Sequence, residues 1–303
     1  MDAALGQLQT EAARPDLADL DTLSTAQLVA VITREDAGVP LAVARVADAI
    51  AAAVDVVVDR LRSGGRLVYV GAGTSGRLAV LDAAELLPTF GVGEESVVAL
   101  MAGGDQAVLE SVEGAEDDEA AAERDLAALD VGPDDVVACI AASGRTPYVI
   151  GAADAARKAG AFTVGVSCNR GSELSAHVDH PVEVLTGPEV VAGSTRMKAG
   201  TAQKLVLNTI STAAMVRLGK VYGNRMVDMR ATNAKLRRRA RRIVGDVTGA
   251  DPSRVEATLE AADGQVKTAI VALLAGVDVG EARRRLDRAE GSVRAAVERG
   301  GRT

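Results

Sequence analysis

Two glycine-containing turns, each between a strand-like apolar run and a helical pattern, constrain the fold of this chain more than any other feature. The first is GAGTSGRL at residues 71–78 and the second is ASGRTP at residues 142–147. In both, hydroxyl side chains stand beside the unpaired N–H groups of a helix start, where the helix dipole adds about half a positive charge. The sequence therefore predicts two turns that bind a phosphate through amides and hydroxyls.

Apolar runs of strand length alternate with helical patterns around these turns. The expected strands are residues 66–70, 96–101, 135–140, 162–167 and 181–185. The expected helices are residues 25–34 and 40–62 before the first strand, then 75–86, 117–128 and 146–158. This alternation indicates an α/β fold with a mostly parallel sheet, whose ligands bind beyond the carboxyl ends of the strands.

The pattern changes after residue 185. Ser194 is a candidate N-cap for a long helix over residues 195–217, and residues 228–245 form another helical pattern with no strand signal after it. Short helical patterns over residues 252–301 predict a small bundle. We therefore expect an N-terminal helical segment at 1–62, an α/β domain at 63–245 and a C-terminal helical domain at 251–303.

Composition excludes several classes of protein. The 303 residues carry a net charge of −8, which argues against a broad nucleic-acid or anionic-membrane surface, and the basic segment KLRRRARR at 235–242 has a solvated helix face as its ordinary interpretation. The chain begins without a secretory signal pattern and contains no apolar run of about 18 residues. Cys139 and Cys168 are too few for a disulfide framework, so we expect buried thiols and a cytoplasmic protein.

Other ligands fit the first turn less well. Gly71, Gly73 and Gly76 match the dinucleotide fingerprint in spacing, but Asp105 is a displaced candidate for the acidic residue that would hold the ribose. The three glycines also suit a turn with a purely structural purpose. His177 and His180 are the only histidines and give a weak metal signal, so no metal or cofactor is expected.

Four segments carry a resemblance to a known family. They are GAGTSGRLAVLDAAELLPTFG at 71–91, VEGAEDD at 112–118, ASGRTPYV at 142–149 and GSTRMKAGTAQK at 193–204. Together they resemble the N-acetylmuramic acid 6-phosphate etherases of the sugar isomerase (SIS) superfamily, over all but the C-terminal helices. The resemblance implies a three-layer SIS sandwich with a five-stranded parallel sheet at 63–245, a small C-terminal helical bundle, and a homodimer whose subunits build the active sites together.

The implied reaction removes D-lactate from N-acetylmuramate 6-phosphate and leaves N-acetylglucosamine 6-phosphate, a step in peptidoglycan recycling. In the ring-opened sugar the aldehyde acidifies the C2 proton, so elimination needs one base and one acid. By matching to the family motifs, Glu85 corresponds to the catalytic acid, and we expect partial burial to raise its pKa. Glu116 corresponds to the second catalytic group, for C2 deprotonation and water activation; Glu113 shares its face if this segment is helical, although Gly114 makes an irregular turn equally reasonable.

Nine residues are candidates for substrate binding. They are Thr74, Ser75 and Arg77 in the first turn, Ser143, Gly144 and Thr146 in the second, and Ser194, Thr195 and Lys198 at the start of the long helix. Lys198 is placed to neutralise phosphate or polarise the aldehyde, with a surface lysine as the alternative. Pro88 is expected to end the first helix soon after Glu85.

The chain departs from the family pattern at Ala13 to Pro15, where relatives usually have RNP, and at Leu86 and Leu87 before PTFG. The first departure weakens any expectation that the N-terminal segment binds as it does in relatives. Two other functions stay open: a non-catalytic sugar-phosphate sensor like the glucokinase regulatory proteins, and a SIS-type isomerase or transcription regulator. The joint presence of Glu85 and Glu116 favours the enzyme.

Overall fold

The chain divides into two compact units. A computed structural model describes residues 8–93, 95–229 and 234–298. Residues 1–84 and 94–211 make up the first unit, and residues 85–93 and 212–303 make up the second. Helix α5 (Gly73–Phe90) and helix α10 (Lys198–Arg217) each contribute residues to both units.

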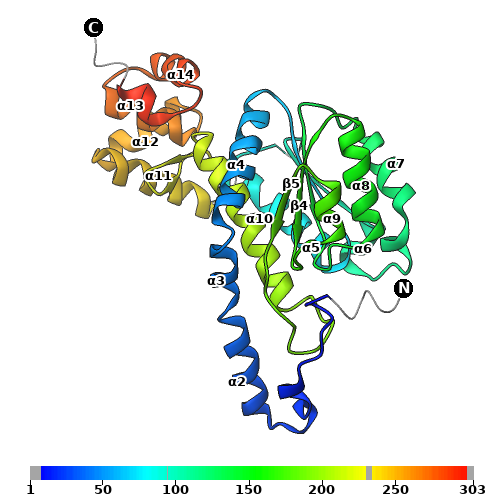
Figure 1. Cartoon of the computed structure of the whole chain (residues 1–303). Helices are drawn as coiled ribbons and strands as arrows, with labels where there is room; N and C mark the ends of the chain where they lie inside the picture. The colour runs from blue at the N-terminus through cyan, green and yellow to red at the C-terminus, as the bar shows by residue number, and fades with distance from the viewer. Residues whose placement is uncertain (1–7, 94, 230–233, 299–303) are drawn as a thin grey trace. The chain divides into compact units, whose positions relative to one another are not determined.

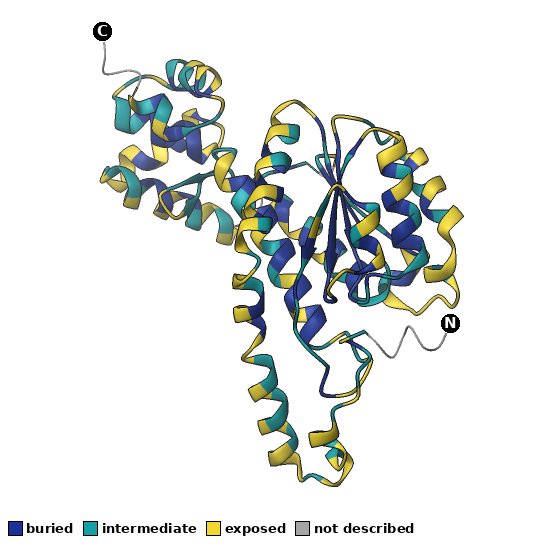
Figure 2. Ribbon diagram, in the orientation of Figure 1, coloured by how far each residue is buried: buried dark blue, intermediate teal, exposed yellow. Residues whose placement is uncertain are grey.

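The first unit is built on a five-stranded parallel sheet in the order β2-β1-β3-β4-β5. Figure 1 labels two of its strands, β4 and β5. The strands are β1 (Leu67–Gly71), β2 (Val97–Met101), β3 (Val136–Ile140), β4 (Phe162–Ser167) and β5 (His180–Glu183). Each overlaps a predicted strand, and all four pairings are parallel. The expected parallel sheet is therefore confirmed, and β1 and β3 are buried along their whole length. The strands of the sheet are mostly coloured as buried in Figure 2.

Alternate residues of β1 point into two different helical layers. Val68 and Val70 pack in a core with side chains of α7 (Glu119–Ala128) and α8 (Pro147–Lys158). Tyr69 points to the opposite face, where its hydroxyl donates to Asp82 of α5 at 2.9 Å. Asp82 also accepts from Asn208 and Ser211 of α10, at 2.5 and 3.2 Å. The sheet therefore lies between two helical layers, and the three-layer SIS-type architecture is confirmed.

Helices before the sheet complete the first unit. They are α2 (Thr25–Asp36), α3 (Val39–Ala44) and α4 (Ala47–Arg62), preceded by two short 3-10 turns, Pro15–Leu17 and Leu20–Thr22. Ser24 and Gln27 form a capping box that starts α2. The prediction of a single helix over 40–62 is wrong, because a turn at Arg45 and Val46 separates α3 from α4. Helix α4 buries Val54, Val57 and Val58 and packs on β3 and β5, whereas α2 buries no residue.

The second unit is mainly helical. Its helices are α11 (Ala234–Thr248), α12 (Pro252–Ala261), α13 (Val266–Ala275), α14 (Val279–Arg288) and α15 (Val293–Glu298). A short antiparallel hairpin, β6 (Val221–Tyr222) with β7 (Arg225–Met226), was not expected from the sequence. Of the helix expected at 228–245, residues 230–233 lie outside the described part of the chain.

The boundary between the units differs from the one expected at 245–251. Val227, Ile243 and Val244 share one core with the C-terminal helices, so the unit begins before α11 rather than after it. Four arginines of α11 are exposed, namely Arg237, Arg238, Arg241 and Arg242, and Arg241 pairs with Glu256 on α12. This agrees with the solvated-face interpretation of KLRRRARR. Within the described residues no helix is both long and apolar enough to cross a membrane.

Candidate functional site

The two glycine turns follow neighbouring strands. In the sheet order β2-β1-β3-β4-β5, the chain leaves β1 toward one edge and returns through β3 on the other side, so the topological switch point lies between β1 and β3. Gly71 at the end of β1 is paired in register with Ile140 at the end of β3. Crevices at such switch points are where open α/β sheets bind their ligands. The fold therefore brings the two predicted phosphate turns to one place.

The first turn needs each of its glycines. Strand β1 ends at Gly71 and α5 begins at Gly73, which has a φ of +53°. A Cβ on Gly71 would lie 2.7 Å from the Gly76 nitrogen, and one on Gly76 would lie 2.7 Å from the Met101 side chain. Any side chain at these positions would push the helix start away from the strand. The tight turn keeps the first N–H groups of α5 at the carboxyl edge of the sheet.

Arg77 connects this turn to the loop that carries Glu116. Its guanidinium donates to the backbone oxygens of Ala107, Val108 and Glu110 at 2.8–3.1 Å. All of its described hydrogen bonds therefore hold the short helix α6 (Gln106–Leu109) and Glu110, which follow β2. These contacts indicate that Arg77 fixes the position of the segment that leads to Glu116.

A pocket of about 330 Å³ lies between the first turn and the Glu116 loop. Its lining includes Gly73 and Arg77 on one side and Glu113 and Glu116 on the other. Gly114 has a φ of +73° and is followed by a 3-10 turn, Ala115–Asp117. Of the two possibilities left open for this segment, the irregular turn is the one observed, and it presents both glutamates to the same pocket.

The second turn is held by a buried asparagine. Asn169 donates through its side-chain amide to the backbone oxygens of Ala142 and Ser143 at 3.2 and 3.3 Å. Gly144 has a φ of +70°, and a Cβ there would lie 2.4 Å from the Cβ of Ser172. Thr146 occupies the N-cap position of α8 without a side-chain capping bond. The turn is therefore rigid, and the Thr146 hydroxyl has no capping role.

Thr10 ties the second turn to the segment before α10. Its hydroxyl accepts from Asn169 at 3.0 Å, and its backbone oxygen accepts from the Gly193 N–H at 3.1 Å. Ser194 and Thr195 follow directly. Because α10 begins at Lys198, the expected helix start at residue 195 and the N-cap role of Ser194 are wrong. Two of the three hydroxyl-containing segments predicted to bind substrate, the second turn and residues 193–195, are nevertheless joined through Thr10 and Asn169.

Lys198 lies in a buried cluster of charges. Its Nζ donates to Glu35 at 3.3 Å, and Glu35 also binds Arg14. The Arg14 guanidinium, with Lys198, holds the pKa of Glu35 below its usual value despite partial burial of that carboxylate. The backbone N–H groups of Lys198 and Ala199 donate to the fully buried Glu189 at 3.0 and 2.9 Å.

These contacts change the interpretation of the α10 start. The alternative of a surface lysine is wrong, because Lys198 is only 4% exposed. We also expected the N-terminus of α10 to bind an anion of the ligand. Instead, its first N–H groups donate to the Glu189 carboxylate.

Glu85 and Glu116 are both exposed in the single chain. The partial burial expected for Glu85 is therefore absent there. Helix α5 also continues through Pro88 and ends at Phe90, so the expected end at the proline is wrong. The following Gly91, with a φ of +64°, donates its N–H to the Leu87 oxygen and ends the helix with a left-handed cap.

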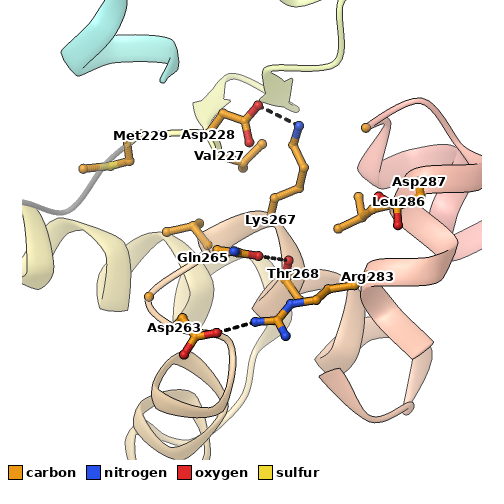
Figure 3. Close-up of a pocket in the computed structure, with 13 residues that line it drawn as sticks. Val227, Asp228, Met229, Asp263, Gln265, Lys267, Thr268, Arg283, Leu286 and Asp287 are labelled. Atoms are coloured by element: carbon orange, nitrogen blue, oxygen red, sulfur yellow. Dashed lines mark hydrogen bonds and ion pairs between the residues drawn. The ribbon is translucent and has the colours of Figure 1, made fainter. Parts of the chain in front are cut away.

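A larger pocket of about 720 Å³ lies within the second unit (Figure 3). None of the residues predicted from the sequence lines it. Four of its charged side chains form two ion pairs, Lys267 with Asp228 at 2.8 Å and Arg283 with Asp263 at 2.6 Å. Burial lowers the pKa of Lys267 even though Asp228 opposes the shift. This pocket is therefore separate from the predicted site in both its residues and its pattern of charges.

The two histidines have separate structural partners. His177 binds Asp154 at 2.8 Å and His180 binds the Ala49 oxygen at 2.7 Å. Among residues 8–93, 95–229 and 234–298, no group of three or more His, Cys, Asp or Glu side chains is arranged to hold a metal ion.

Three buried polar residues of the site were not predicted from the sequence. They are Asn169, Glu189 and Gln203, each at most 2% exposed. Glu189 stands between apolar residues in GPEVVAG, and Gln203 lies in GSTRMKAGTAQK. Glu189 could have been singled out because it is a charged residue in an apolar stretch. The partners of Asn169 could not be predicted from its neighbours in the sequence.

Comparisons with known proteins agree with this architecture. A family model described as the glucokinase regulatory protein N-terminal SIS domain matches residues 49–157. An N-acetylmuramic acid 6-phosphate etherase from Rubrobacter xylanophilus is 60% identical over 302 residues and 100% of both chains, and one from Deinococcus radiodurans is 56% identical over 96% of both. A solved phosphoheptose isomerase from Francisella tularensis matches 64% of this chain and 100% of its own at 19% identity with a TM-score of 0.51, which shows a shared fold.

Proposed function

The chain belongs to the family of N-acetylmuramic acid 6-phosphate etherases, and from this membership we propose that it cleaves the D-lactyl ether of N-acetylmuramate 6-phosphate. The products are D-lactate and N-acetylglucosamine 6-phosphate, so the reaction serves peptidoglycan recycling. The two free, buried cysteines are compatible with a cytoplasmic enzyme.

One observation carries the proposal at the level of the site. The two hydroxyl-containing turns follow β1 and β3, the strands that flank the switch point of the sheet. The N–H groups and hydroxyls of Ser75, Ser143 and Thr146 suit the phosphate of a sugar. The pocket beside the first turn brings Glu116 to the same edge of the sheet.

We assign the chemistry to two glutamates. Glu116 removes the C2 proton of the ring-opened sugar, and the electron pair forms a C2–C3 double bond as the C3–oxygen bond breaks. Glu85 gives its proton to the departing lactate oxygen. Water, deprotonated by one of these carboxylates, then adds to C3, and a proton returns to C2. This scheme assigns Lys198 no step, since its Nζ donates to Glu35.

We propose that a second copy of the chain completes the site. Glu85 and Glu116 are exposed in the single chain, so one chain alone does not shield them from water. Helix α2 buries no residue, and Val29 and the α3 residue Leu41 are 55% and 63% exposed. Light scattering tests this assignment, with Leu41→Glu expected to weaken a dimer and a monomeric wild-type protein contradicting it.

A sensor of sugar phosphates is the second candidate. The matched family model, that of a regulatory-protein SIS domain, supports it. Such a protein needs the two turns but neither glutamate. The presence of both Glu85 and Glu116 favours the enzyme.

The experiment is incubation of the purified chain with N-acetylmuramate 6-phosphate in H₂¹⁸O. We expect free D-lactate and N-acetylglucosamine 6-phosphate with ¹⁸O at C3, because water adds there after elimination. N-acetylmuramate without the phosphate is the matched control and should react far more slowly. Binding without lactate release would support the sensor, and ¹⁸O in the lactate would contradict the elimination mechanism.

A further inference from the structure

The buried side-chain amide of Gln203 has a hydrogen-bond partner at its oxygen but none at its nitrogen within the described part of the chain. It lies on α10, is 1% exposed, and accepts a hydrogen bond through Oε1 from the Ser75 hydroxyl at 2.9 Å. Its Nε2 is buried and finds no partner among the residues that the structure describes. Buried amide donors without a partner are rare in folded proteins, so this one calls for an explanation.

Other buried polar groups on the same helix are satisfied. Asn208 and Ser211 both donate to Asp82, which also accepts from Tyr69. The three donors of this cluster are therefore all bound to the Asp82 carboxylate. Gln203 instead lies one turn after Gly200, where a Cβ would come within 3.4 Å of Thr74 in the first phosphate turn. The incomplete amide therefore lies against that turn.

The Ser75 hydroxyl has a single proton, which decides what it can bind. While this proton is donated to Gln203 Oε1, Ser75 offers only lone pairs, and a phosphate oxygen also offers only lone pairs. A half-turn of the Gln203 amide exchanges Nε2 and Oε1 in the same volume. Nε2 then donates to Ser75 Oγ, and the Ser75 proton becomes available to an anion.

We propose that Gln203 is a positioning residue that sets the Ser75 hydroxyl as a donor to the substrate phosphate. The proposal rests on the phosphosugar function proposed above. The amide donates to Ser75 Oγ in the ligand-bound state, and in that state the Ser75 hydroxyl donates to a phosphate oxygen. Gln203 does not itself touch the reacting atoms, so its effect appears in phosphate affinity rather than in the elimination step.

The test is a double-mutant cycle between Gln203 and Ser75. Gln203→Met keeps the length of the side chain without its amide, and Gln203→Glu keeps the shape but can only accept from Ser75. For Gln203→Met we expect KM and the Kd of N-acetylglucosamine 6-phosphate to rise about tenfold, as for one lost hydrogen bond to a charged group, with kcat little changed. Gln203→Glu should raise both further, because it adds a negative charge beside the phosphate.

The decisive measurement is the effect of Gln203→Met on KM and Kd in a protein that already carries Ser75→Ala. Because Gln203 acts through the Ser75 hydroxyl, adding Gln203→Met to Ser75→Ala should change neither KM nor Kd further. Additive losses in the two backgrounds would overturn the proposal, as would an unchanged affinity in the single Gln203 variants. Ser211→Ala, another buried polar position on α10, is the control and should leave the affinity unchanged.

Two measurements keep the result interpretable. Thermal unfolding shows whether each variant folds, and Gln203→Glu carries the test if Gln203→Met does not fold. Calorimetric binding of N-acetylglucosamine 6-phosphate does not depend on turnover. A wild-type protein that binds this product but releases no lactate would contradict the proposed enzyme while leaving the Gln203–Ser75 coupling measurable.

Discussion

At the amino edge of the five-stranded sheet Arg66 and Asp135 bind each other, whereas at the carboxyl edge Glu113 and Glu116 are exposed. Asp135, just before β3, accepts four hydrogen bonds at 2.7–3.0 Å, three from Arg66 just before β1 and one from the Gly132 N–H. Arg66 also donates to the Leu129 oxygen at 2.8 Å. This network joins the two central strands where the chain enters them.

The carboxyl edge is built from glycine turns, where Arg77 and Asn169 donate hydrogen bonds to backbone oxygens. Glycines bring the backbone into close contact, and Glu113 and Glu116 line an open pocket while remaining exposed. The Ser75–Gln203 pair leaves an amide donor unused. We infer that the two edges of the sheet have different roles: the amino edge stabilises the fold, and the carboxyl edge holds the polar groups proposed to bind the ligand. Each of the following variants tests that separation.

The largest effect is expected at the carboxyl edge, for Glu116→Gln. The variant cannot take the C2 proton, so kcat for lactate release should fall about 10²- to 10⁴-fold. Its melting temperature should not change, because the side chain is exposed. Asp117→Asn, in the same exposed turn, is the matched control and should keep its activity. Normal lactate release by Glu116→Gln would remove Glu116 from the mechanism.

At the amino edge, Asp135→Asn should affect stability instead. The substitution leaves the Arg66 guanidinium without its carboxylate, and we expect a loss of about 3 kcal/mol in the free energy of unfolding. Urea denaturation measures this loss, with the neighbouring exposed Asp134→Asn as control. The kcat of the folded Asp135→Asn protein should equal that of the wild type. A reduced kcat with unchanged stability would reverse the assignment of the two edges.

A smaller effect is expected for Ser143→Ala in the second turn. Loss of one hydroxyl contact to the phosphate should raise KM about tenfold and leave kcat nearly unchanged. Steady-state kinetics of lactate release provides both constants, and inorganic phosphate should inhibit the variant more weakly than the wild type. If KM stays at the wild-type value, the phosphate binds elsewhere.

The smallest effect concerns acid. Burial alone would raise the pKa of Asp135, but hydrogen bonds from Arg66 and Gly132 outweigh it and hold that pKa below 3.8. Because the unfolded chain then binds the proton more tightly, this group stabilises the fold fully above about pH 4 and loses its contribution as the pH falls through the folded pKa. Urea denaturation between pH 3 and 6 should show a shallower pH dependence for Asp135→Asn than for the wild type. Equal slopes would contradict this origin of acid sensitivity.

Local patterns predicted much of the fold. The five strands and the helices that begin at the two turns followed from short stretches of sequence, and a tight turn was one interpretation of Gly71, Gly73 and Gly76. The errors arose where distant contacts decide. Helix α5 passes Pro88 and stops at Gly91, beside the Asp228 backbone, and α10 starts at Lys198 because Glu189 binds its first N–H groups.

The sequence by itself determined the residue types and the spacing of the candidate site, because a strand, a glycine turn and a helix start are set by neighbours along the chain. Only the tertiary structure decided which side chains these groups meet. The strand order brings the two turns together, Arg77 holds the Glu116 loop, Glu35 binds Lys198, and Gln203 meets Ser75. Hydrogen bonds of this kind join residues far apart in the sequence, and their geometry exists only once the sheet and its helices have packed.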